Sequence, residues 1–330
     1  MAYENQQTRY GAIAMKLPFT PGKIMFVVPN SQNSYGDFQF QYPVDLNGRV
    51  RTFSTLAQAY AAADDNANDV IILDGNSTHT LTEMLSITKN RVHFYGLDYF
   101  TGADRPYGCS AKVSLAVSTG ATNIATIKNT GIRNSFHNIK FINGSTVTEG
   151  IYSFVEGGEY TFMENCEIYK STDLDVTGAA ELVMNGDSAY LKNCTIGSLA
   201  DARSGAVIRP NVLFTAGIAG AGKVARDVTF ENCNFWIQST NTANRFVYGA
   251  NATDVERLAL FDRCKFICNG ASSAIPAQNV AFGATLTVGA VLLSYCTSVL
   301  ASTAMSTTTG VYVDGAVPAA ATTGISVQAS

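Results

Sequence analysis

Acidic side chains are the residues of this chain whose spacing could support acid–base chemistry. The candidates are Glu156 with Glu159, Asp173 with Asp175, Asp254 with Glu256, and Asp262. Two carboxyl groups hydrolyse a glycosidic bond when they lie about 5–5.5 Å apart in retaining enzymes or about 6.5–9.5 Å apart in inverting ones. Because neighbouring strands lie about 4.8 Å apart, almost any two acids on adjacent strands meet one of these distances. The signal is unspecific, so we expect a solvated face and assign no catalytic residue.

A glycine-rich segment, Gly217-Ile-Ala-Gly-Ala-Gly-Lys-Val, nearly matches a phosphate-binding loop. Val224 stands where that motif needs a Ser or Thr hydroxyl to hold magnesium. The residues that follow, Ala225 to Phe230, have the pattern of a strand, whereas the motif requires a helix. We therefore predict a long loop here and no nucleotide site.

The histidines and cysteines do not have the spacing of metal ligands. The chain has three histidines, His79, His93 and His137, and none belongs to a ligand-spaced cluster. Cys264 and Cys268 are the one close pair among seven cysteines, and no Cys-x-x-Cys occurs. The sequence predicts buried, reduced thiols, no metal site and no cofactor.

Composition excludes several partner classes. The net charge of −4 leaves no basic footprint for nucleic acid. The longest apolar runs, such as Ile71–Leu73 and Val291–Leu293, are far too short to cross a bilayer. The first residues lack the charged and apolar regions of a secretory signal. The single Trp, Trp236, points outward if Phe235 points inward, where it could stack on a sugar or cover a protein interface.

A repeat determines where these side chains lie. Its anchor positions, 27 to 39 residues apart, are Ile139, Cys166, Cys194, Cys233, Cys264 and Cys296. Three residues before them stand Phe136, Met163, Leu191, Phe230, Phe261 and Leu293, and two residues after them stand Phe141, Ile168, Ile196, Phe235, Phe266 and Ser298. Self-similarity at this period is typical of stacked repeat folds. All these columns are apolar except at Ser298, so we expect them to face one interior.

An asparagine before the anchor explains how positions −3 and 0 can share a face. In a straight strand, residues an odd number apart point to opposite faces. Asn138, Asn165, Asn193 and Asn232 stand between the two columns, and Asn tolerates the left-handed conformation that bends the chain. A short strand, a bend and another short strand predict the corner of a right-handed parallel β-helix. This is an all-β solenoid, and its stacked Asn side chains could hydrogen-bond in a ladder.

The ends of the chain complete the domain prediction. Leu56, Ala59, Tyr60 and Ala63 have helical spacing, with Ser54 as N-cap, and a buried strand from residue 69 follows. A helix of this kind caps the open end of a solenoid. We predict an arm and lead-in over residues 1–50, the capped β-helix over 51–300, and closing strands over 301–330.

The apolar segment before the helix is a candidate partner-binding arm. It is extended and interrupted by Pro, and its apolar side chains are Met15, Leu17, Phe19, Ile24 and Phe26. Such arms pack either on a neighbouring subunit or along their own β-helix, and the residues favour neither.

Residues 134–298, with the entry at 53–75, resemble the pectate-lyase-like right-handed β-helix superfamily. Proteins of this fold often carry glycan lyases and hydrolases, so the resemblance implies the fold and leaves the function open. The lyases' cluster of Asp calcium ligands with a downstream Arg has no counterpart that we can place in this chain.

Three further segments, Gly22–Val28, Gly48–Ala59 and Gly102–Pro106, resemble structural proteins of tailed bacteriophages. This resemblance implies a non-enzymatic virion protein that decorates or cements the capsid surface, as a homotrimer, after assembly in the host cytoplasm. The major capsid protein would be its partner, through the arm. The alternative is a tail spike that binds or cleaves a host surface polysaccharide.

Overall fold

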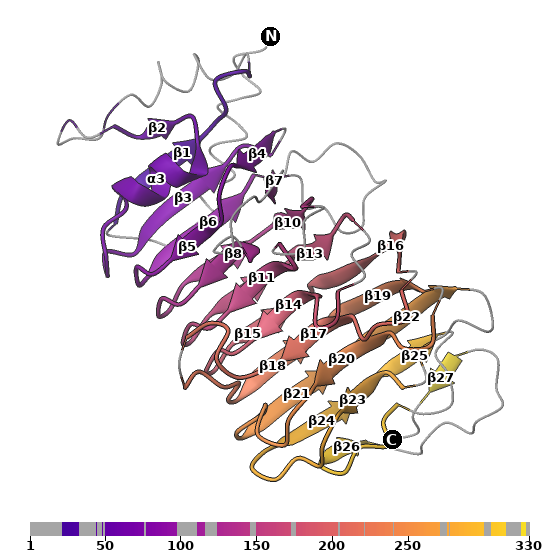
Figure 1. Cartoon of the computed structure of the whole chain (residues 1–330). Coiled ribbons are helices and arrows are strands. Elements are labelled where there is room, and N and C mark those ends of the chain that lie inside the picture. Colours follow the sequence, from indigo (N-terminus) through magenta and orange to yellow (C-terminus); the bar gives the residue numbers. More distant parts are fainter. Residues whose placement is uncertain are drawn as a thin grey trace.

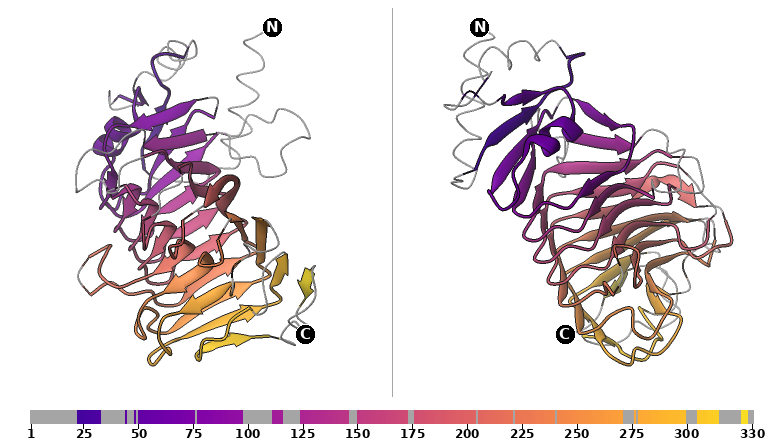
Figure 2. Two further views of the ribbon diagram at one scale, coloured as in Figure 1. Left: turned by 45° about the vertical axis from the view of Figure 1, so that its right-hand side comes forward. Right: turned by 60° about the vertical axis from the view of Figure 1, so that its left-hand side comes forward.

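The computed structural model describes residues 22–32, 44, 48, 50–75, 77–97, 111–115, 124–145, 150–172, 176–203, 205–220, 222–239, 241–270, 276, 278–299, 305–314 and 325–327. They form three sheets, which we call sheets I, II and III. The strands stack into one elongated rod that runs from the indigo end to the yellow end of the chain (Figure 1). Figure 2 shows the same stack from two further directions.

Sheet I contains, in spatial order, β2 (Thr52–Phe53), β1 (Ile24–Val27), β3 (Asp69–Leu73), β6 (Val92–Gly96), β9 (Ser135–His137), β12 (Phe162–Glu164), β15 (Tyr190–Lys192), β18 (Val228–Glu231), β21 (Leu258–Asp262), β24 (Ala290–Ser294) and β26 (Val311–Val313). Sheet II contains β4 (Thr78–Leu81), β7 (Ala111–Leu115), β10 (Ile139–Asn143), β13 (Glu167–Lys170), β16 (Thr195–Arg203), β19 (Asn234–Ser239), β22 (Lys265–Gly270), β25 (Thr297–Val299) and β27 (Ile325–Val327). Sheet III contains β5 (Leu85–Ile87), β8 (Ala125–Asn129), β11 (Tyr152–Glu156), β14 (Ala180–Met184), β17 (Pro210–Phe214), β20 (Arg245–Gly249) and β23 (Val280–Phe282).

Each coil passes through the sheets in the order I, II, III, as β12, β13 and β14 do. Each of these strands pairs in parallel with its equivalent in the next coil, for example Met163 with Leu191 and Ile168 with Ile196. Among the described strands, β27 is the exception, since it pairs antiparallel with β25. The predicted parallel β-helix is therefore confirmed.

The bend between sheets I and II lies at the predicted asparagines. Asn138, Asn165, Asn193 and Asn232 have φ values of 51° to 56°, in the left-handed region. The side-chain amide of Asn165 donates to Asn138 Oδ1 at 3.2 Å, and that of Asn232 donates to Asn193 Oδ1 at 2.7 Å. The asparagine ladder is thus formed, and it joins coils on the outside of the bend while the next residue turns inward.

The anchor cysteines form a continuous file inside the rod. Cys166, Cys194, Cys233, Cys264 and Cys296 are free thiols and at most 1% exposed. Each Sγ donates to a carbonyl of its own bend and to one of the preceding coil, as Cys194 does to Lys192 O at 3.4 Å and Met163 O at 3.7 Å. These bonds satisfy the thiols, which are buried and reduced as the sequence predicted. Cys109 lies outside the described residues.

The apolar columns on either side of the file make the core. Phe136, Met163, Leu191, Phe230, Phe261 and Leu293 are at most 1% exposed. Rings stack from coil to coil, with centroids 4.6 Å apart for Phe230 and Phe261 and 4.9 Å apart for Phe235 and Phe266. Ser298 ends the second column and accepts a hydrogen bond from Asn279 Nδ2 at 2.7 Å.

A short helix, α3 (Leu56–Ala62), packs beside the first coils and buries Leu56, Ala59 and Tyr60. Its N-cap is Thr55, whose hydroxyl accepts from Gln58 N at 3.2 Å, so the prediction of Ser54 is wrong by one residue. Ser54 instead donates to the Gln58 side chain. Among the described residues, no helix is long and apolar enough to cross a membrane.

Replacing Phe230 by Ala tests this inside-and-outside assignment. Phe230 is fully buried, stacks on Phe261 and meets Phe235 edge-on, so Phe230→Ala should lower the free energy of unfolding by about 3–5 kcal/mol. Thr229→Ala is the matched control, because Thr229 is the preceding residue on the outer face and should change stability by less than about 1 kcal/mol. Urea unfolding measures both, and equal losses would contradict the assignment.

Candidate active site

The outer face of sheet I carries two columns of side chains that match across coils. His93, Ser135, Phe162 and Tyr190 are register partners on β6, β9, β12 and β15. Two residues further along, Tyr95, His137, Glu164 and Lys192 are partners in the same way. Since residues two apart share a face of a strand, the columns stand side by side on the outside of the rod.

The hydroxyl of Ser135 lies between two imidazoles. Ser135 Oγ is 2.8 Å from His93 Nδ1 on the preceding coil and 3.1 Å from His137 Nε2 on its own strand. Ser135 is a buried residue with 8% of its surface exposed.

Three contacts fix the ring of His137. Its Nδ1 is 3.5 Å from Glu164 Oε2, with the two side chains 14% and 33% exposed. The Tyr95 ring stacks on the imidazole with centroids 4.3 Å apart and planes 4° from parallel. Phe162 meets it edge-on at 5.4 Å. The ring is therefore held with one nitrogen toward the serine and the other toward the carboxylate.

Burial keeps both histidines neutral near pH 7. It lowers the pKa of His137 below the usual value, although the charge and hydrogen bond of Glu164 act in the opposite direction. It also lowers the pKa of His93, against the charge of Asp69. A neutral imidazole has one N–H and one acceptor nitrogen. With Nδ1–H toward Glu164, Nε2 of His137 accepts the Ser135 proton, and His93 Nδ1–H donates to the hydroxyl.

A hydroxyl, a neutral imidazole and a carboxylate in this order are the parts that activate a serine nucleophile. The imidazole takes the proton as the hydroxyl attacks, and the carboxylate stabilises the imidazolium that forms. Catalytic hydrogen bonds tighten when substrate binds, which accommodates the 3.5 Å separation of His137 and Glu164. The arrangement can therefore carry out acyl transfer.

An aromatic row continues from this cluster along the sheet. The rings of Phe162 and Tyr190 lie 5.5 Å apart at 32°. Tyr190 Oη donates to Glu231, which also accepts from Arg263 Nη2 at 2.9 Å. The row presents apolar ring surface beside hydrogen-bonding groups, which is the combination that binds sugars.

The carboxylates singled out from the sequence have other partners. Glu159 pairs with Lys223 at 3.1 Å, Glu256 with Arg226 at 2.5 Å, and Asp262 with Arg263 at 2.8 Å. Asp254 is fully buried and accepts from Asn251 N at 2.8 Å. Asp173 and Asp175 lie outside the described residues. Trp236 stands on β19 beside the fully buried Phe235, with its own side chain half-buried.

Glu156, like Asp254, is fully buried, and neutral groups donate to its carboxyl group. It accepts from Asn129 Nδ2 at 2.9 Å, Gly158 N at 2.6 Å and Thr161 Oγ1 at 3.0 Å. Burial raises the pKa of Glu156 to about 7, and the hydrogen bonds reduce the shift. Its bonds join the end of β11 to the turn that follows, which is a structural role.

The glycine-rich segment is a loop after β17, as predicted, and strand β18 follows it. The loop folds back over earlier coils: Ala219 N donates to Asn185 Oδ1 at 3.3 Å, and Lys223 reaches Glu159. Without a helix after the loop, the segment cannot bind phosphate as a P-loop does.

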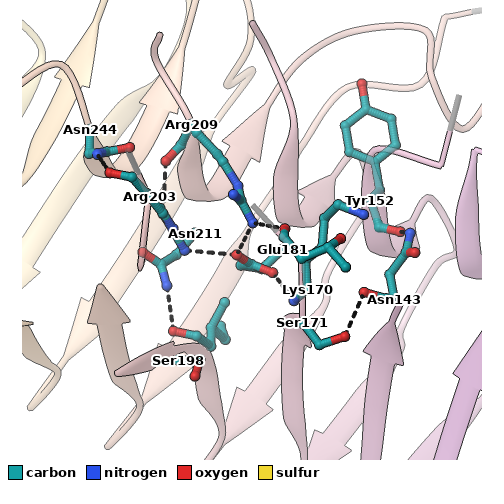
Figure 3. A network of polar contacts seen from close by, with 12 residues as sticks. Asn143, Tyr152, Lys170, Ser171, Glu181, Ser198, Arg203, Arg209, Asn211 and Asn244 are labelled. Carbon is teal, nitrogen blue, oxygen red and sulfur yellow. Dashed lines mark hydrogen bonds and ion pairs between the residues drawn. The ribbon is translucent and has the colours of Figure 1, made fainter. Parts of the chain in front are cut away.

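A second polar cluster lies at the corner between sheets II and III (Figure 3). Glu181 Oε1 accepts from Arg203 Nη2 at 2.8 Å, and Arg203 Nη1 donates to Arg209 O at 2.8 Å. Lys170 Nζ donates to the carbonyls of Ser145 at 2.6 Å and Gly150 at 3.0 Å, and burial lowers its pKa to about 8. These cations bind backbone carbonyls of the connecting loops, so the cluster closes the corner of the rod.

The arm residues fall into two groups. Met15, Leu17 and Phe19 lie outside the described residues. Ile24 and Phe26 belong to β1, which pairs with β2 and β3, and Phe26 packs with Val28 and Val70 of the same chain. Their role in binding a partner stays a prediction.

Solved structures place the fold in a known class. A pectate lyase, Pel9A, matches 84% of this chain with 12% identity and a TM-score of 0.54, and the chain spans 63% of that protein's length. The pectin methylesterase from Aspergillus niger matches 85% of this chain and 87% of its own, with 13% identity and a TM-score of 0.47. No family model matches the chain, and the comparison with curated proteins found no match.

The likeness to the pectate lyase shows a right-handed parallel β-helix, as the sequence predicted. It also contradicts one prediction. The chain was expected not to be an enzyme, whereas the pectate lyase whose fold it shares is one. ORF18 of Geobacillus virus E2 matches 82% of this chain and 62% of its own, with 12% identity and a TM-score of 0.33, which is too low to support the virion assignment.

Ser135, His137 and Glu164 were not among the predicted site residues, although the sequence holds a signal for them. His137 and Glu164 each stand two residues before an anchor, at Ile139 and Cys166, and Ser135 stands four before. Because position −3 faces inward, positions −2 and −4 face outward in every coil. Reading these outer columns as carefully as the inner ones would have brought the three residues together.

Glu156→Gln should flatten the pH dependence of stability. The pKa of Glu156 is raised from 4.5 to about 7 by folding, so between these values the folded chain holds a proton that the unfolded chain has lost. The free energy of unfolding should therefore fall, by about 3 kcal/mol at most, as pH rises through this window. The Glu156→Gln variant has a neutral amide that does not titrate, so this contribution to the fall in the free energy of unfolding should be absent. Urea unfolding at both ends of the window tests this, and parallel curves for the two proteins would contradict it.

Proposed function

We propose that this protein binds a surface polysaccharide along the outer face of sheet I and modifies it at Ser135. One observation carries the proposal. Ser135 contacts His137 at 3.1 Å, and His137 contacts Glu164 of the next coil at 3.5 Å, beside an aromatic row. The binding surface comprises Tyr95, Phe162, Tyr190, Lys192 and Glu231.

The chemistry of this surface suits a carbohydrate. Sugar rings have apolar C–H faces that pack on aromatic rings, and hydroxyl groups that bond carboxylates and ammonium groups. Phe162 and Tyr190 provide the rings, and Lys192 and Glu231 stand next to each other in register. Coils repeat these groups along the rod, so an extended chain can contact several of them at once.

The fold supports the same class of ligand. The pectate lyase and the pectin methylesterases share the β-helix, and one of the methylesterases was solved with a bound hexasaccharide. A shared fold alone does not define a substrate, so the side chains of sheet I carry the argument.

A second proposal concerns where the protein acts. We propose that it is a bacteriophage virion protein, held on the capsid surface or the tail by the N-terminal end of the rod. The major capsid protein is the proposed partner on the capsid, and a homotrimer the proposed assembly. The supporting observation is that β2 and β1 form one end of sheet I, so residues 1–21 join the rod at its end. The outer face of sheet I further along the rod then stays available for a glycan.

Removing the two rings of the row should weaken glycan binding. The double variant Phe162→Ala with Tyr190→Ala should bind the host's surface polysaccharide at least about tenfold more weakly, a loss of about 1.4 kcal/mol. Tyr312→Ala is the control, since Tyr312 is 61% exposed on β26 at the other end of the same sheet. Calorimetric titration with the purified polysaccharide measures the affinities. Unchanged binding by the double variant would reject this surface.

Deleting residues 1–22 should abolish attachment to the particle and leave the β-helix folded. The deletion ends before β1, so every described strand is retained. Co-sedimentation with particles that lack the protein measures attachment, and circular dichroism checks the fold. Attachment by a folded deletion variant would exclude the arm as the anchor.

A further inference from the structure

We propose that Ser135 is the nucleophile of an esterase that removes small O-acyl groups, such as acetyl, from the bound polysaccharide. This inference rests on the proposed function, since it names the reaction of the same site. It depends on the contacts of the Ser135 hydroxyl with His93 and His137, and on the contact of His137 with Glu164.

His137 is the base, and His93 is a hydrogen-bond donor. His137 presents Nε2 to Ser135 Oγ at 3.1 Å and Nδ1 to Glu164 at 3.5 Å, so its two nitrogens connect the nucleophile to a carboxylate. His93 presents Nδ1 to the same oxygen at 2.8 Å. A hydroxyl that donates to His137 can accept from His93, which satisfies all three groups together. Glu164 is a positioning residue, because it acts through His137.

The reaction balances without any co-reactant except water. Ser135 Oγ attacks the ester carbonyl carbon, its proton moves to His137 Nε2, and the carbonyl electron pair becomes an oxyanion. The carbon–oxygen bond to the sugar then breaks, and His137 gives its proton to the sugar oxygen. Water attacks the acyl-serine, passing a proton to His137, which returns it to Ser135 Oγ. The products are the free sugar hydroxyl and a carboxylic acid.

One donor stands beside the nucleophile. His93 Nδ1–H contacts Ser135 Oγ at 2.8 Å, so an acyl group bonded to that oxygen lies next to this donor. Donors placed in advance around a developing charge lower the barrier, and losing one typically costs about 10²–10³ in rate.

The confinement of Ser135 selects a small acyl group. The residue is 8% exposed and has His93 and Phe162 as its neighbours on the two adjacent coils. A buried hydroxyl favours an acetyl substituent, which projects from a sugar ring, over a glycosidic bond, which lies within the bulk of the sugar chain. The sugar itself then packs on Phe162 and Tyr190.

The test uses the full-length protein with p-nitrophenyl acetate, an O-acetylated polysaccharide and a fluorophosphonate probe. We expect hydrolysis of the small ester, release of acetate from the polysaccharide, and one covalent adduct on the peptide that contains Ser135. Ser135→Ala should abolish the adduct and lower kcat/KM at least about 10³-fold, since loss of a triad nucleophile is among the largest single effects known. Ser294→Ala, a serine on the same face in β24, should leave both unchanged.

The pH profile separates a base from a structural residue. Activity should rise with pH as His137 loses its proton, with an apparent pKa below 6.5, because burial lowers the pKa of that ring. The Glu164 carboxylate raises the pKa of His137, so Glu164→Gln should move the rise to lower pH while reducing kcat. A purely structural role for Glu164 would leave the midpoint where it is.

The outcomes distinguish this inference from the proposed function. Glycan binding with no ester hydrolysis and no adduct would overturn the esterase and leave the binding surface standing. Hydrolysis by Ser135→Ala at the wild-type rate would overturn it as well. Ester hydrolysis that depends on Ser135, in a protein that binds no polysaccharide, would support the nucleophile and reject the proposed substrate.

Discussion

The left-handed bend at the residue before each anchor is the constraint on which the rest of this structure depends. That residue is Asn before four of the anchors, Arg263 before Cys264 and Tyr295 before Cys296. A strand that alternates sides cannot send both position −3 and the anchor inward. The φ of about +50° to +56° at Asn138, Asn165, Asn193 and Asn232 resets the alternation, so that a large apolar residue and a thiol enter the same interior. The asparagine amides then bond from coil to coil, and the cysteine thiols use the carbonyls of the bend. The inward or outward direction of the side chains, the filling of the core and the spacing of the coils follow from this single backbone feature.

The same bend determines the outer face. Once position −3 is inward, positions −2 and −4 must point to solvent, and parallel pairing brings them into columns. Ser135 and His137 come from one strand, and Glu164 comes from the next coil, 27 residues after His137. A site built on paired strands is held by the hydrogen bonds of the sheet rather than by loops, which gives the fixed geometry that acyl transfer requires.

The sequence predicted the parts of this molecule that repeat, because a repeat shows its physical cause several times. The cysteine file, the apolar columns and the bends at Asn were all accessible in this way. The Ser135 site was not, because its three members occur once each and their contact depends on register between coils whose length varies from 27 to 39 residues. The prediction of a non-enzymatic chain counted carboxylates and tryptophans, and so did not consider a hydroxyl and an imidazole. The cap at Thr55 shows the usual uncertainty of one residue at a helix end.

The polar clusters of the rod differ in what their hydrogen bonds hold in place. This difference separates the structural clusters from the candidate active site. Inside the rod, the carboxyl group of Glu156 accepts hydrogen bonds from an amide, a backbone N–H and a hydroxyl, and these bonds hold the turn after β11. At the corner of sheets II and III, Lys170 and Arg203 donate to loop carbonyls, so breaking those bonds would open the corner. On sheet I, by contrast, the contacts of Ser135 join side chains to one another and support no backbone. A proton can pass between Ser135 and His137 without loosening a strand, because the sheet that holds both residues does not depend on that bond.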